Sequence, residues 1–218
     1  MIKALMLTLL LSLSVQPALA NPQTFNGVLQ AYWLPIWHND VNQPQLTYRF
    51  FPDAASAAKG KVINLRHPAL DLKRLQQDHP EFVAQRQGHV EYYGTLKVDE
   101  STAYNECGLD FYEAQQAVFT PQAPQPFDIE QLEKQSGCQS YPWLLSYQLK
   151  ENAAAVVLRA APDSNAEAVA RLSGDRPLVQ IRQVNADWLQ VAVYDAANQP
   201  PMGNTRGYIE LRHLQPLN

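Results

Sequence analysis

The sequence predicts a mainly β protein made of two small barrel-like domains with short helices. Short segments with alternating apolar and polar residues recur in both halves of the chain. Sixteen prolines favour turns and strand edges over long helices. The proline-rich stretch 120–126 is stiff and extended, and it separates the two β-rich regions as a connector.

These features divide the chain into four parts. Residues 1–20 are expected to be a signal peptide, 21–119 a barrel-like domain, 120–150 the connector with a short helix, and 151–218 the second domain. The first part begins with Lys3, continues through a leucine-rich run and ends in small residues at Ala18 and Ala20. Cleavage after Ala20 predicts a periplasmic or secreted protein. No segment is long and apolar enough to predict a transmembrane helix.

The charge balance argues against nucleic acid and anionic lipid as partners. The formal net charge is −4, and −5 without residues 1–20, which hold one lysine and no acid. Nucleic acid requires a basic patch for its phosphates, and anionic membranes require a polybasic segment.

Strands are expected in the first domain at 24–33, with a bulge at Gly27, at 46–51 and at 61–65, with a polar loop at 37–44. A helical turn is expected at 54–58. Leucine spacing predicts a helix over 70–77, with Asp71 as its cap and Pro80 as its terminator. The clearest strand is 89–98, where Gly94 allows a sharp bend and one face carries Val90, Tyr92, Gly94, Leu96 and Val98.

Cys107, Leu109 and Phe111 continue the alternation on the expected partner strand. Five short strands with a helix between the third and fourth resemble the OB-type barrel. The alternative is an irregular α+β unit around the same central hairpin. Both arrangements have a β core.

The two cysteines, Cys107 and Cys138, are expected to form a disulfide, because the protein is predicted to be exported to an oxidising compartment. A short helix beginning near Asp128 is expected to end at Gly137, next to Cys138. The disulfide would then hold this helix against the first domain.

The last third of the chain carries three landmarks in order: Val157–Pro162, Asp187–Val191 and Gly207–Leu211. Together they resemble the bacterial SH3 domain family. The resemblance implies a small SH3-like barrel that binds a ligand and does not catalyse a reaction. Tyr208 stands where the family commonly has tryptophan, which weakens the transfer of a specific ligand groove. The alternation places Val191 inward and Gln190 outward, and 165–170 shows weak helical spacing.

Aromatic side chains are the candidate ligand-binding residues: Trp37, Trp188, Tyr194 and Tyr208. Trp37 is flanked by polar residues, so an exposed contact role is expected. For Trp188, packing in the core is the competing interpretation, since indoles are usually mostly buried.

No catalytic group, metal or cofactor is expected. Cys107 lacks the following serine and the helical setting of papain-like cell-wall enzymes, and only His213 follows it as a base. The five histidines show no metal-ligand spacing, and there is no glycine-rich phosphate loop.

The sequence therefore predicts a non-catalytic cell-envelope protein whose second domain recognises peptidoglycan or an envelope protein. The alternative is an inhibitor or regulatory partner of an envelope hydrolase that uses the loop Tyr32–Asp40 as a plug. A cysteine-type cell-wall hydrolase is the third hypothesis.

Overall fold

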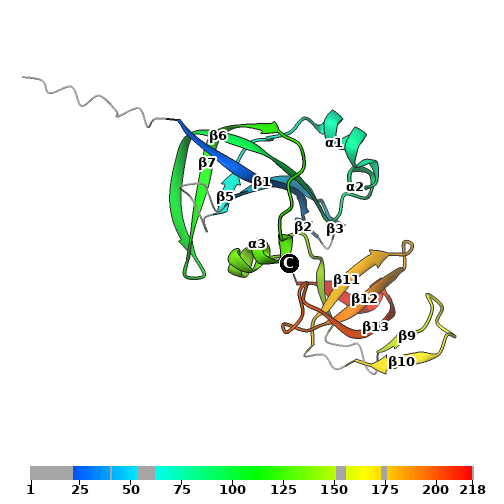
Figure 1. Ribbon diagram of the computed structural model, residues 1–218. Helices are drawn as coiled ribbons and strands as arrows, with labels where there is room; N and C mark the ends of the chain where they lie inside the picture. Colours follow the sequence, from blue (N-terminus) through cyan, green and yellow to red (C-terminus); the bar gives the residue numbers. More distant parts are fainter. Residues whose placement is uncertain (1–21, 40, 54–61, 151–155, 173–175, 218) are drawn as a thin grey trace, which may run out of the picture.

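The computed structural model describes residues 22–39, 41–53, 62–150, 156–172 and 176–217 (Figure 1). The described chain is mainly β, as predicted, with a closed five-stranded barrel followed by a curled seven-stranded sheet and a few short helices. The predicted signal peptide and the helical turn predicted at 54–58 lie outside the described residues. Within the described part, no helix has the length and apolar character needed to cross a membrane.

The barrel matches the expected pattern of five strands with helices between the third and fourth. Its strands are β1 (Gln23–Leu34), β4 (Gln45–Pro52), β5 (Val62–Leu65), β6 (His89–Glu106) and β7 (Leu109–Pro121). They close in the order β1-β4-β5-β7-β6, with β5 and β7 parallel and the other neighbouring strands antiparallel. A Cβ at Gly94 would overlap the carbonyl oxygen of Thr120, so the close approach of β7 to β6 requires the glycine expected there.

The two helices cover part of the barrel core. Asp71 caps α1 (Leu72–Asp78) by accepting a hydrogen bond from the Lys73 amide at 3.0 Å, as predicted. Pro80 was expected only to end this helix, but it also begins α2 (Pro80–Gln85), where its missing N–H costs nothing. Leu75 and Phe82 join the barrel interior, which also contains Phe25, Leu29, Phe50, Ile63, Leu96 and Phe119.

The expected position of Cys107 on the partner strand was wrong, because this residue lies at the tip of the β6–β7 hairpin. Cys107 (φ 51°) and Gly108 (φ 75°) form the turn between the strands, so Cys107 does not lie on the partner strand. Positive φ at both central residues is the turn conformation that suits a tight hairpin. The turn presents Cys107 to Cys138, and the predicted disulfide is confirmed.

The outer face of the barrel is covered by residues 128–143, which we call the strap. The strap contains α3 (Ile129–Gln135), close to the predicted helix, and the 3-10 turn η1 (Gly137–Gln139). Leu132 of the strap packs on a second apolar cluster on the outward side of the strands, formed by Val28, Phe51, Val62 and Phe111. This side of the barrel wall is therefore buried on both faces, and Figure 1 shows α3 lying against the barrel.

Arg49 on β4 connects the barrel to the strap. Its side chain is 1% exposed and donates from Nε to Gln30 Oε1 at 2.7 Å, and from Nη1 and Nη2 to the carbonyl oxygens of Gln139 and Ser140. The guanidinium also lies over the rings of Phe51 and Trp143, 4.9 and 5.3 Å from their centroids. Arg49 thus provides hydrogen-bond donors for the carbonyls of two half-buried strap residues.

Carboxylates and a histidine surround this arginine. The Nε2 group of Gln30 donates a hydrogen bond to Glu91 Oε1 at 3.1 Å, and the same carboxylate pairs with His89 at 3.0 Å. Burial alone would raise the pKa of Glu91. The hydrogen bond and charge of His89, together with the hydrogen bond from Gln30, outweigh the effect of burial, so the pKa of Glu91 is lowered. Burial raises the pKa of Glu133 on the strap. Burial also lowers the pKa of Arg49 to about 10, so the guanidinium remains charged at neutral pH.

The C-terminal sheet comprises β8 (Ser146–Leu149), β9 (Val157–Arg159), β10 (Ala168–Arg171), β11 (Leu178–Gln183), β12 (Trp188–Tyr194), β13 (Met202–Glu210) and β14 (Leu214–Pro216). Their order is β10-β9-β13-β12-β11-β8-β14, and η2 (Leu211–His213) joins the last two strands in sequence. The sheet thus includes Ser146–Leu149, which lies in the stretch assigned to the connector. The weak helical spacing at 165–170 was misleading, because Ala168–Arg171 forms an edge strand.

The core of this sheet has the predicted register. Val191 is fully buried and Gln190 is half-buried, so the inward and outward faces fall as expected. The other buried members include Leu145, Tyr147, Leu158, Leu178, Leu189, Val193, Ile209 and Leu214. Trp37 from the first half of the chain packs against the same core.

Arg49→Ala is expected to destabilise the protein by about 3 to 5 kcal/mol, because it leaves the buried Gln30 without its donor and removes both hydrogen bonds to the strap. Arg66→Ala is the matched control: Arg66 pairs with Glu113 at 2.7 Å on the surface, and exposed pairs of this kind contribute about 1 kcal/mol or less. Urea unfolding of both variants measures the difference. Equal, small losses would show that Arg49 does not hold the strap.

Candidate functional site

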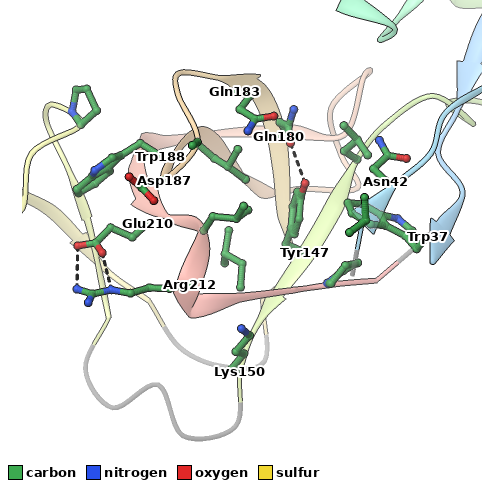
Figure 2. Close-up of a pocket in the computed structure, with 18 of the residues that line it drawn as sticks. Trp37, Asn42, Tyr147, Lys150, Gln180, Gln183, Asp187, Trp188, Glu210 and Arg212 are labelled. Carbon is green, nitrogen blue, oxygen red and sulfur yellow. Dashed lines mark hydrogen bonds and ion pairs between the residues drawn. The ribbon is translucent and has the colours of Figure 1, made fainter. Parts of the chain in front are cut away.

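An open groove of about 1260 Å³ lies where a small hairpin from the first half meets the C-terminal sheet (Figure 2). The hairpin consists of β2 (Trp37–His38) and β3 (Val41–Asn42), which replace much of the polar loop expected at 37–44. Strands β8, β11, β12, β13 and β14, the segment 162–164, η2 and residues beside β8 and β12 supply the remaining lining residues. Both halves of the chain therefore build the site.

One end of the groove is formed by the β2–β3 hairpin. Trp37 meets Tyr147 edge to face with ring centroids 5.7 Å apart, and Asn42 Oδ1 accepts a hydrogen bond from the Ile36 amide at 3.2 Å. Gln180 accepts from the Tyr147 hydroxyl at 2.9 Å and donates to Gln87 at 3.3 Å, across to the first half. The Trp37–Tyr147 contact thus joins the hairpin to the sheet, and the Gln180–Gln87 bond joins the sheet to another part of the first half.

Trp188 marks the other end. The turn before β12 is held by Asn185, whose Oδ1 accepts from the amides of Asp187 and Trp188, both at 2.9 Å. Glu210 is paired with Arg212, and Figure 2 shows Trp188, Asp187 and Glu210 grouped together, away from Trp37 and Asn42. Among the described residues, the Asp187 carboxylate has no side-chain partner. This end thus combines an aromatic ring with an available negative charge.

Between the two ends, four leucines and one tyrosine contribute to the lining of the groove. Leu145, Leu189, Leu211 and Leu214 line it together with Tyr147. Burial raises the pKa of Tyr147 to about 12, so its hydroxyl stays protonated and keeps donating to Gln180. Lys150 adds a positive charge to the lining.

Two of the four predicted ligand-binding residues line this groove. Trp37 and Trp188 stand in its walls, and both are half-buried. Tyr194 lies at the end of β12 and is 39% exposed. Tyr208 is half-buried on β13, where it pairs with Gln190 and Arg159. Neither tyrosine lines the groove. The four residues therefore do not share one surface.

Asn42, Tyr147, Gln180 and Asp187 were not singled out from the sequence. Asp187 directly precedes Trp188, which was the available signal for it, whereas Asn42 lies opposite Trp37 only because β2 pairs with β3. No sequence pattern indicated Tyr147 or Gln180 as site residues, because their place in the groove depends on the pairing of β8 with β11.

The cysteines offer no catalytic or metal-binding thiol. Cys107 and Cys138 are joined, and Glu106 beside them accepts a hydrogen bond from Gln139. His213 lies in η2, and its carbonyl accepts from the Lys150 amide at 3.0 Å. Among the described residues, no cysteine is free.

Comparison of the chain with family models, with curated proteins and with solved structures finds no match in any of the three. The function of the groove therefore has to be inferred from its geometry and from the residues that carry the SH3 resemblance.

The raised pKa of Tyr147 predicts a loss of stability in alkali. Its pKa is higher in the folded protein than the ordinary value of 10, so its contribution is complete below pH 10 and is lost as the pH rises toward about 12. Tyr147→Phe should show a smaller fall in unfolding free energy over this range than the wild type. Urea unfolding at several pH values measures both slopes, and identical slopes would contradict the buried, hydrogen-bonded hydroxyl.

Proposed function

We propose that the protein is a non-catalytic binding protein of the cell envelope, and that the groove between the β2–β3 hairpin and the C-terminal sheet binds peptidoglycan. The observation that carries the proposal is a large open groove with a tryptophan at each end and charged groups of both signs. Aromatic faces suit sugar rings and peptide segments at low entropy cost.

The size of the groove favours part of a polymer over a small metabolite. Pockets for small molecules usually enclose about 300 to 1000 Å³ and bury most of the ligand. This groove is larger and is open to solvent. Peptidoglycan supplies sugar rings for Trp37 and Trp188, amines for Asp187, and carboxylates for Lys150.

The outer face of the barrel is less suited to the same task. OB-type barrels generally bind ligands on the outer face of their second and third strands. The corresponding strands here are β4 and β5, whose outward residues Arg49, Phe51 and Val62 are buried beside the strap. The disulfide and the bonds from Arg49 hold the strap in place. The groove is the more accessible site.

The envelope location rests on two supports. The sequence predicts an export signal, and the disulfide between Cys107 and Cys138 suits an oxidising compartment. The SH3 resemblance of the last third of the chain supports a binding role there, although Tyr208 lies outside the groove.

The rival functions receive less support from the geometry. As a plug against a hydrolase, the loop 32–40 would have to be exposed, yet Tyr32 and Trp33 are buried and Trp37 packs on Tyr147. A cysteine-type hydrolase needs a thiolate, and Cys107 is held in a disulfide.

Trp188→Ala is expected to weaken retention on purified sacculi by about tenfold or more, since a buried aromatic contact commonly supplies that much binding energy. Tyr194→Ala is the matched control, because Tyr194 is an exposed aromatic residue on the same strand but outside the groove. Co-sedimentation at low and high salt measures retention. The proposal fails if the wild type does not sediment with sacculi, or if both variants bind as it does.

A further inference from the structure

We infer that the β2–β3 hairpin end of the groove is a binding site for an amide carbonyl group of the ligand, with the indole N–H of Trp37 and the side-chain amide of Asn42 as donors. The inference rests on the proposed function and adds to it the chemical group that is recognised. It also assigns part of the specificity to the first half of the chain rather than to the SH3-like half.

The indole N–H of Trp37 carries the inference. Its Nε1 atom is buried, and among the described residues it is the buried side-chain polar atom left without a hydrogen-bond partner. Leaving a buried donor unpaired is unfavourable, because the donor loses its bond to water and gains none in return. Trp33 shows the usual arrangement, because its Nε1 donates to the carbonyl oxygen of Phe82 at 2.9 Å. The unused donor of Trp37 is therefore suited to an acceptor that arrives with the ligand.

Asn42 provides a second donor on the same hairpin. Its register partner on β2 is Trp37, and both residues line the groove. Asn42 Oδ1 is engaged by the Ile36 amide, while its Nδ2 group donates to no described residue. Trp37 and Asn42 thus present N–H groups from opposite strands of the hairpin, with the apolar side chain of Val41 beside them.

Two donors beside an apolar surface suit a neutral acceptor that carries an apolar substituent. An amide carbonyl meets this description, and no cation from the described hairpin residues lines this end to favour a carboxylate. Peptidoglycan offers amide carbonyls from two sources, the N-acetyl groups of its sugars and the bonds of its peptides. Because Nε1 is covered by protein atoms, the acceptor reaches it with a shift of the Trp37 side chain or of the hairpin.

Indole resonances in ¹H–¹⁵N spectra of the full protein test the inference directly. The chain has four tryptophans, so Trp37 can be assigned with Trp37→Phe, and Trp33, already bonded to Phe82, is the internal control. The probes are a linear tetramer of N-acetylglucosamine, its deacetylated form and a synthetic stem pentapeptide. We expect the Trp37 proton to move to lower field with a carbonyl-bearing probe, while the Trp33 proton stays in place.

The probes separate the two carbonyl sources. A shift with the acetylated but not the deacetylated tetramer assigns the site to sugar acetamido groups, and a shift with the pentapeptide alone assigns it to peptide carbonyls. The inference is overturned if the Trp37 proton does not shift with any probe at saturating concentration. It is also overturned if the Trp37 proton of the free protein is already as far downfield as that of Trp33, because the Trp37 donor would then be in use.

Variants give an independent measure. Asn42→Asp keeps the oxygen that accepts from Ile36 but removes the N–H donor, and it should weaken binding of the active probe about 2- to 10-fold. His38→Ala, an exposed neighbour outside the lining, should bind as the wild type does. Equal binding by both variants overturns the inference.

Retention on sacculi is measured in parallel. Retention without the indole shift contradicts this inference alone, and an indole shift without retention contradicts the proposed function alone.

Discussion

The buried guanidinium of Arg49 is the constraint on which the arrangement of this protein depends. It lies on the outer wall of the barrel, bonds to Gln30 beside it and to two carbonyls of the strap, and packs against Trp143. A desolvated charge is tolerated only when its donors are satisfied, so the strap and the barrel wall require each other. The disulfide holds the strap at a second point, at the tip of the β6–β7 hairpin.

This constraint determines which surface is free to bind. The strap occupies the outer face of the barrel and then leads, through Trp143, into β8 of the C-terminal sheet. Trp143 contacts Tyr32 at the end of β1, just before the β2–β3 hairpin. The hairpin therefore emerges next to the sheet, where Trp37 packs on Tyr147. A groove with walls from both halves follows from this path of the chain.

The sequence predicted most of the fold and part of the site, and the differences have physical causes. Alternation identified the barrel strands and the inward position of Val191, and the cysteine pair predicted the disulfide. Local patterns could not place Cys107 in a turn, because its positive φ depends on the pairing of long strands. Trp37 was identified as an aromatic residue in polar surroundings, and Trp188 as an aromatic residue of the segment that resembles SH3 domains. Tyr147, Gln180 and the buried Arg49 depend on contacts between segments distant in the chain, which periodicity does not reveal.

Hydrogen–deuterium exchange with and without soluble peptidoglycan fragments tests the central claim most directly, because it reports on the strap and the groove in one experiment. The account predicts slower exchange of the β2–β3 hairpin and of the turn before Trp188 when the fragments bind. It also predicts unchanged slow exchange of the Arg49 strand and of residues 128–143. Protection confined to the strap or to the outer barrel strands, with none at the hairpin, would contradict it.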